Sequence, residues 1–224
     1  MVRLRWVLGV LTALVVVAVP YGYYRSVYVH THRLRVVADG RFYRCGTLPA
    51  AGFREAIKRF GIKTVVNLRE EGDAGRDPLL AADWLASWRG QRTVPESEVC
   101  KAAGVRYFQI EGGVLDDPGQ EPGGRPQMID DFLSVCDDPA NEPILIHCKA
   151  GRDRTGLLTA VWRMEYQHRT QAQAVAELKA NGFATFAATD GNAYLDRLVL
   201  KHQVGVRRKP SDRVGAMAKG GVAP

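Results

Sequence analysis

Residues 143–156, PILIHCKAGRDRTG, carry the strongest indication of the fold. This stretch starts with an apolar run at residues 144–146, which is typical of a buried strand. A short polar segment follows, and the apolar residues after position 156 predict a helix. The stretch therefore predicts a strand, a tight loop and a helix. Cys148 stands where this loop begins, and Arg154 stands where it ends.

The spacing between the cysteine and the arginine suits the binding of an anion. Five residues can curl so that their backbone N–H groups converge on one ligand, and the following helix adds its positive N-terminal end. The Arg154 guanidinium can grip two phosphate oxygens, and the same field favours a nucleophilic thiolate at Cys148. We therefore expect a phosphate-binding loop made of Cys148, Lys149, Ala150, Gly151, Arg152, Asp153 and Arg154.

Three further residues of this stretch are expected to support the loop. Gly151 allows the backbone to approach the ligand closely and to adopt unusual dihedral angles. Thr155 can donate its hydroxyl to the Cys148 sulfur and stabilise it as a leaving group. His147 is interpreted as an orienting residue behind the loop rather than as a proton carrier.

These residues resemble a known family signature. His147-Cys148, Gly151 and Arg154-Thr155-Gly156 resemble the His-Cys-x5-Arg-Thr/Ser-Gly motif of the cysteine-based protein tyrosine and dual-specificity phosphatases. Residues 42–46 and 65–69 also resemble segments of the small atypical dual-specificity phosphatases. Many relatives carry serine where this chain has Cys45, which we interpret as a structural small residue.

The pattern of elements predicts an α/β fold. Strands are expected at residues 41–44, 62–68, 105–110 and 143–147, and helices at 51–60, 79–88, 96–103, 125–135, 157–167, 171–180 and 192–202. Their alternation predicts a central, mainly parallel sheet flanked by helices, with the phosphate site at the carboxyl end of a strand. The resemblance implies the same phosphotyrosine-phosphatase-like fold.

Phosphate ester cleavage needs a group that protonates the leaving oxygen. The resemblance implies an aspartate on a loop that closes over the substrate, and residues 111–119 are rich enough in glycine to form one. Asp116 and Asp117 are the candidates there. Asp153 is a third candidate, because Gly151-Arg152-Asp153-Arg154 resembles a bacterial subgroup whose loop aspartate is proposed as the acid. The sequence does not choose among the three.

The charges of the loop bear on the substrate. Lys149 and Arg152 add two cations to Arg154, and such a loop resembles those of the phosphoinositide-cleaving members. Phosphorylated proteins and phosphoinositides are both candidate substrates. No metal or cofactor is expected, because the cradle and Arg154 neutralise the phosphate, and the four cysteines match no zinc spacing. The net charge of +7 suits an anionic partner, but no nucleic-acid motif accompanies it.

The N-terminus predicts a membrane anchor. Residues 6–24 carry no charge over a length that spans a bilayer as a helix. A cleaved signal peptide is the competing interpretation, but no convincing cleavage site follows the apolar core. Residues 1–25 are thus read as the anchor, 26–35 as a basic linker, 36–203 as the phosphatase domain and 204–224 as a disordered basic tail. The basic residues after the anchor favour a cytoplasmic catalytic domain at the membrane.

Taken together, the sequence predicts a membrane-anchored phosphatase of the dual-specificity type, which acts through a cysteinyl-phosphate intermediate. One alternative is a catalytically weak phosphatase-like module that binds phosphorylated partners at the membrane. A second alternative is a sulfur-transfer or arsenate-reducing domain, which also uses a cysteine loop. The Arg-Thr-Gly ending of the loop and the helices after it argue against the second.

Overall fold

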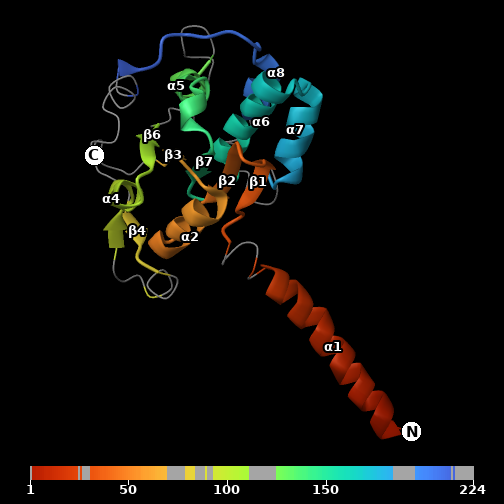
Figure 1. Ribbon diagram of the computed structural model, residues 1–224. Coiled ribbons are helices and arrows are strands. Elements are labelled where there is room, and N and C mark those ends of the chain that lie inside the picture. Colours follow the sequence, from red (N-terminus) through yellow and green to blue (C-terminus); the bar gives the residue numbers. More distant parts are fainter. Residues whose placement is uncertain are drawn as a thin grey trace.

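A computed structural model of the chain describes residues 2–24, 26, 31–69, 79–83, 89, 93–110, 125–183, 195–212 and 214. Its centre is a five-stranded sheet in the order β1-β2-β7-β3-β6 (Figure 1). The strands are β1 (Arg35–Ala38), β2 (Phe42–Gly46), β3 (Thr64–Asn67), β6 (Arg106–Gln109) and β7 (Ile144–Cys148). Only β1 runs antiparallel to its neighbour, so the predicted mainly parallel α/β sheet is confirmed.

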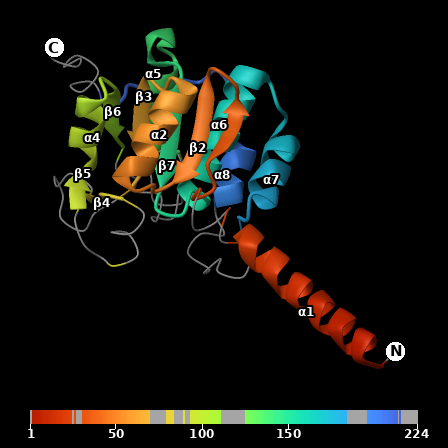
Figure 2. The same ribbon diagram turned by 60° about the horizontal axis from the view of Figure 1, so that its bottom comes forward.

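Helices cover both faces of the sheet (Figure 2). One face packs against α2 (Ala50–Phe60) and α4 (Glu96–Ala102), with Phe53 and Val99 among the buried residues. The other face packs against α5 (Gln127–Cys136), α6 (Asp153–Gln167), α7 (Gln171–Ala180) and α8 (Leu195–Lys201). Because strand residues alternate between the two cores, β7 sends Leu145 to one side and Ile146 to the other.

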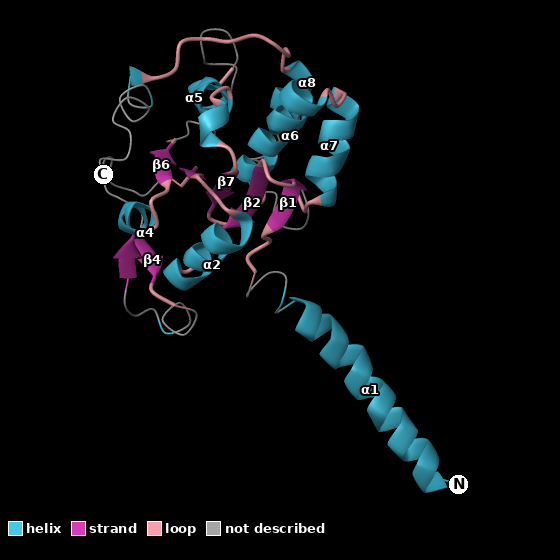
Figure 3. Cartoon of the chain, viewed as in Figure 1, coloured by secondary structure: helices cyan, strands magenta, loops and turns pink. Residues whose placement is uncertain are grey.

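The helix α1 (Val2–Tyr24) projects away from this domain (Figure 3). Its segment Arg5–Tyr23 is long and apolar enough to cross a membrane, and none of it is buried within the protein. A signal sequence shares these properties. The sequence prediction of an apolar N-terminal helix is therefore confirmed at the level of the helix itself.

Two segments differ from the sequence predictions. Residues 79–81 were expected to begin a helix, but they form the strand β4 (Leu79–Ala81), which pairs antiparallel with β5 (Thr93–Pro95). This pairing buries Leu80 completely in the core beneath α2 and α4, and such long-range packing overrides the helix propensity of leucine and alanine.

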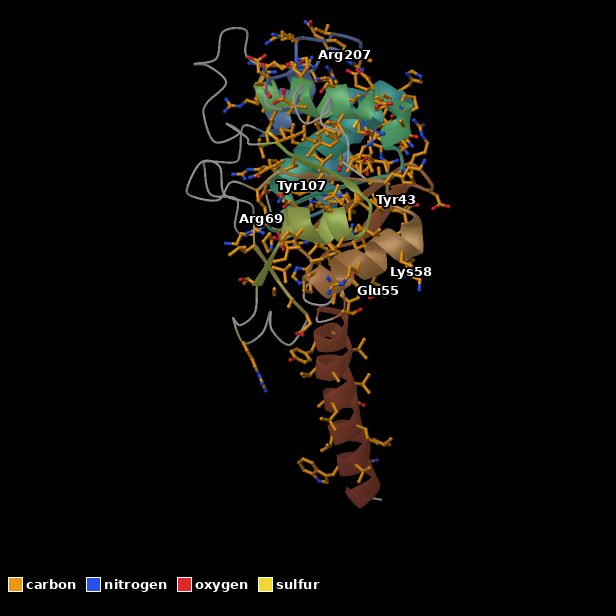
Figure 4. All side chains as sticks on the ribbon, turned by 60° about the vertical axis from the view of Figure 1, so that its left-hand side comes forward. Tyr43, Glu55, Lys58, Arg69, Tyr107 and Arg207 are labelled. Atoms are coloured by element: carbon orange, nitrogen blue, oxygen red, sulfur yellow. The ribbon has the colours of Figure 1, made fainter. Side chains whose placement is uncertain are left out.

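The second difference concerns residues 204–212 of the expected disordered tail (204–224); residues 213 and 215–224 fall outside the described residues. Residues 202–212, here named the C-terminal strap, lie across α5 and α6 rather than free of them. Asp131 of α5 accepts hydrogen bonds from the Ser211 N–H (2.6 Å) and the Ser211 hydroxyl (2.8 Å). Arg207 pairs with Asp137 at 2.6 Å and with Glu165 at 3.0 Å. Figure 4 shows Arg207 at the end of the domain away from α1.

Candidate active site

The cysteine loop lies at the centre of the sheet. Strand β7 pairs with β2 on one side and with β3 on the other, and Cys148 is its last residue. Residues 149–152 form the turn, after which α6 begins at Asp153. Cys148 is 6% exposed and thus buried at the carboxyl end of the central strand. This is the position that parallel sheets use for ligands.

The turn after Cys148 has its carbonyl groups held outward. Three successive carbonyls, those of residues 149–151, each accept a hydrogen bond from outside the loop. The Thr47 N–H donates to the first (3.1 Å), Arg33 Nη1 to the second (2.6 Å) and Arg44 Nη2 to the third (2.9 Å). Among the described residues, the N–H groups of positions 149–153 donate to no protein acceptor. The loop thus keeps a set of backbone donors for an anion.

Arg44 is the most deeply buried of the three residues that donate hydrogen bonds to the loop carbonyls. Its side chain comes from the middle of β2 and is 3% exposed. Burial and the nearby Arg35 lower the pKa of Arg44 to about 10, so it stays charged at neutral pH. A fixed positive charge therefore lies beneath the loop, where it favours a bound anion.

Two glycines let the loop and β2 approach each other. Gly151 has a φ of +64°, and a Cβ there would lie 2.5 Å from the carbonyl carbon of Cys45 and from the Gly46 nitrogen. A Cβ on Gly46 would lie 3.1 Å from the Ala150 carbonyl carbon. Gly151 thus meets the prediction of an unusual backbone conformation, although its close neighbour is β2 rather than a ligand.

The cations of the loop are arranged differently from one another. Arg154 Nη1 donates to the Leu68 carbonyl (2.9 Å), which fixes its guanidinium at the end of β3. Arg152 folds back on Asp153 and binds both carboxylate oxygens, at 3.0 and 3.1 Å. Lys149 is exposed. Arg154 is therefore positioned by the sheet, whereas Arg152 is occupied by its neighbour.

The other two residues expected to support the loop, His147 and Thr155, behave differently from each other. His147 is fully buried, and its Nε2 lies 2.6 Å from a carboxylate oxygen of Glu96. This agrees with an orienting role behind the loop. The Thr155 hydroxyl is also buried, but it has no hydrogen-bond partner among the described residues. The expected hydrogen bond from Thr155 to the Cys148 sulfur is thus absent here.

Cys45 lies on the opposite face of the sheet from Cys148. It is paired in register with His147 and packs in the core beneath α2, whereas Cys148 belongs to the core beneath α6. Burial, assisted by the Glu96 carboxylate, raises the pKa of the Cys45 thiol well above its usual range. These observations agree with a structural small residue.

Three remaining expectations concern the acids and metal binding. Asp116 and Asp117 fall outside the described residues. Asp153 is described, and its carboxylate is paired with Arg152 as above. Within the described ranges, no group of three or more histidine, cysteine, aspartate or glutamate side chains is placed to hold a metal ion.

Comparison with known protein families identifies the family to which a chain with this loop belongs. The model of a tyrosine phosphatase family matches residues 25–166, more than half of the chain, including the whole cysteine loop. The chain belongs to this tyrosine phosphatase family. Among curated protein sequences, none matches it.

Solved structures show the same phosphatase fold. The catalytic core of the PP-IP phosphatase Siw14 from S. cerevisiae, bound to citrate, superimposes with a TM-score of 0.55 at 19% identity, covering 88% of this chain and 97% of that one. A second structure of the Siw14 core gives 0.54 at 18% identity, covering 86% and 93%. A DUF442 protein from Shewanella putrefaciens gives 0.52 at 16% identity, covering 78% and 93%. The predicted phosphotyrosine-phosphatase-like fold is confirmed.

Sequence reasoning missed the residues that hold the family's loop in place. Arg33 lies in the segment expected to be a linker, yet it contacts the loop through the Ala150 carbonyl. Arg44 and Glu96 lie about fifty to a hundred positions before the loop and reach it only through the sheet. The one available signal was local: Arg44 is a charged residue within an otherwise apolar strand, FYRCG.

Proposed function

We propose that this protein is a phosphoric monoester hydrolase that acts through a cysteinyl-phosphate intermediate. The observation that carries the proposal is the loop after β7. Its carbonyls at positions 149–151 accept hydrogen bonds from outside the loop, and among the described residues the N–H groups of positions 149–153 donate to no protein acceptor. A tetrahedral phosphate, with three equatorial oxygens to satisfy, is the ligand that such a ring of donors suits best.

The proposed reaction has two steps. In the first, the Cys148 thiolate attacks phosphorus, an S–P bond forms, and the P–O bond to the leaving alcohol or phenol breaks. The leaving oxygen takes a proton from a carboxylic acid. In the second, water attacks phosphorus, the S–P bond breaks, and phosphate leaves while the same carboxylate takes the proton of the water. The loop N–H groups and Arg154 neutralise the equatorial oxygens in both steps.

The acid is best assigned to Asp116 or Asp117. A general acid must carry a proton at the start of the reaction. The Asp153 carboxylate binds Arg152 through both of its oxygens, so each oxygen already has a partner within the loop. Asp153 is therefore better suited to holding Arg152 in the loop than to donating a proton.

The substrate is proposed to be a phosphorylated protein on tyrosine, serine or threonine, or a phosphoinositide. The exposed Lys149 beside the loop and the buried charge of Arg44 beneath it give the site more positive potential than one phosphate needs. The apolar α1 would hold this site at a membrane as a single-pass anchor, where a lipid head group or a membrane protein is within reach. The basic residues of the sequence between α1 and the domain favour a cytoplasmic site.

Phosphate release by the full chain in detergent tests the proposal. The substrates are an aryl phosphate, a phosphotyrosine peptide, a phosphoserine peptide, a set of phosphoinositides and, because of the Siw14 core, an inositol pyrophosphate. Turnover that disappears in Cys148→Ser supports a hydrolase. The substrate with the highest kcat/KM then identifies the class of substrate that the enzyme prefers. Binding of phosphopeptides without turnover of any substrate would instead support a phosphatase-like binding module.

A further inference from the structure

The site contains a buried carboxylate that the reaction described above does not use. Glu96, the first residue of α4, is fully buried, as is its partner His147. One of its oxygens lies 2.6 Å from His147 Nε2, and the other accepts a hydrogen bond from Asn67 Nδ2 at 2.9 Å. Because an unpaired buried carboxylate is very costly, both oxygens must keep these partners.

These two partners lie next to the residues that carry the chemistry. His147 immediately precedes Cys148 on β7, and Asn67 immediately precedes Leu68 at the end of β3. The Leu68 carbonyl holds Arg154 Nη1 (2.9 Å), and the Leu68 N–H donates to the His147 carbonyl (2.8 Å). One carboxylate therefore ties together the strand end that presents the nucleophile and the strand end that fixes the phosphate-binding arginine.

We propose that Glu96 is a positioning residue that acts on Cys148 through His147; the inference rests on the proposed function. Its carboxylate keeps a proton on His147 Nε2 and locks the imidazole behind the loop. A carboxylate that accepts from an imidazole N–H fixes the ring's tautomer and its orientation. Phe53 packs its ring edge-on against the imidazole, at 5.0 Å between centroids.

Few other titratable groups face this pair. Among the described residues they are Cys45 from β2, which pairs in register with His147, and Tyr107 from β6, whose hydroxyl accepts a hydrogen bond from Asn67 Nδ2 (3.1 Å). Burial raises the pKa of Cys45 far enough to keep its thiol neutral at neutral pH. Glu96 is thus the carboxylate that contacts the His147 ring directly, at 2.6 Å.

The test is Glu96→Gln in the full chain, with Glu98→Gln as the matched control. Glu98 lies on the same helix but is exposed, so the control makes the same change of charge away from the site. Glutamine supplies one acceptor and one donor where His147 and Asn67 both need an acceptor, so one of them is left unpaired in either orientation of the amide.

The readout is the rate at which iodoacetate alkylates Cys148 as a function of pH, together with kcat and KM on an aryl phosphate. We expect Glu96→Gln, which leaves His147 poorly held behind the loop, to slow the alkylation of Cys148 about tenfold near neutral pH, to lower kcat by about the same factor and to change KM less. Glu98→Gln should match the unsubstituted protein, and Glu96→Asp should recover part of the loss. Alkylation of Cys148 that is unchanged or faster in folded Glu96→Gln overturns the inference.

The test of Glu96 gives a result even if the protein hydrolyses no substrate or if the variant does not fold. Alkylation requires no turnover, so it tests Glu96 even if no substrate is hydrolysed and the proposed function fails. If Glu96→Gln does not fold, NMR of the unsubstituted protein takes its place. We then expect a downfield proton on His147 Nε2 that exchanges slowly with water, assigned through ring-to-backbone correlations that separate it from the buried His202. A rapidly exchanging proton there overturns the inference.

Discussion

Gly151→Ala is the substitution that tests the architecture of the loop most sharply. Gly151 has a φ of +64°, and an added Cβ would lie 2.5 Å from the carbonyl carbon and oxygen of Cys45. These atoms belong to the β2 backbone, between β1 and β7, so they have little freedom to move. The substitution therefore meets two separate costs, one from the dihedral angle and one from the contact.

The two costs have different magnitudes and different consequences. An L-residue in the left-handed region costs about 1–2 kcal/mol of stability. To restore an ordinary contact of about 3.4 Å, the loop must also move by roughly 0.9 Å. A displacement of about 1 Å in a catalytic group costs on the order of 100-fold in rate. We therefore expect Gly151→Ala to lose about 2 kcal/mol of stability and about 100-fold in kcat/KM.

Gly61→Ala is the matched control, because Gly61 ends α2 with a φ of +61° and a Cβ there would meet nothing within 4 Å. It should lose stability by the dihedral cost alone and keep its activity. The measurements are unfolding in urea and phosphate release from an aryl phosphate. If Gly151→Ala is as active as Gly61→Ala, the close approach of the loop to β2 does not govern catalysis and the reasoning is refuted.

Three further predictions follow from the supports of the loop and from the strap. Arg44→Lys should lower kcat/KM by roughly tenfold with a smaller loss of stability, because the shorter side chain keeps the charge but loses the hydrogen bond to the Gly151 carbonyl (2.9 Å). Steady-state kinetics and thermal unfolding of the variant measure the two effects. Arg33→Ala removes the hydrogen bond to the Ala150 carbonyl and should lower phosphatase activity several-fold. A fragment that starts at residue 36 also lacks Arg33 and should have the same reduced activity. A fragment that starts at residue 26 keeps Arg33 and should be as active as the full chain. Acidification should release the C-terminal strap in two stages. Hydrogen exchange at the backbone amides of residues 202–212 measures this release. Burial lowers the pKa of His202, so the stability it contributes is complete above its unfolded pKa of about 6.5 and is lost as pH falls through its lower folded pKa. Burial raises the pKa of Glu165, but hydrogen bonds from Arg207 and His202 outweigh it and lower the pKa overall, so its contribution is lost only at pH values below about 4. Exchange in the strap that does not change between pH 7 and pH 3 would contradict this account.

The loop and its strand could be predicted because their determinants are local. The apolar residues 144–146, the cysteine and the arginine six positions later lie within one short stretch, and the family match includes all of it. The parallel sheet followed from alternating strand and helix patterns, which the structure reproduces for β3, β6 and β7.

The supports of the loop could not be predicted, because they depend on contacts across the sheet. Arg44 reaches the Gly151 carbonyl, 107 positions later, only because β2 lies beside β7. Glu96 meets His147 only because α4 packs over the same face. Nothing in the residues next to either one indicates its partner.

The ordered conformation of the C-terminal strap could not be predicted, for a related reason. Its sequence is polar and basic, a composition that is typical of disordered segments. Its order comes from carboxylates elsewhere in the chain, namely Asp130 and Asp131 of α5 and Glu165 of α6, which accept its hydrogen bonds. A basic segment becomes ordered when acidic partners at fixed positions bind it, and local composition does not reveal such partners.

The central claim, that Cys148 carries the phosphoryl group, is tested most directly by trapping the intermediate. The full chain is mixed with an aryl phosphate, quenched in acid within milliseconds and digested, and the peptide that contains the loop is weighed by mass spectrometry. The account predicts one phosphoryl group on the Cys148 sulfur, formed in a burst with the released phenol and absent in Cys148→Ser. Release of the phenol with no phosphoryl group on Cys148 at any quench time would contradict it.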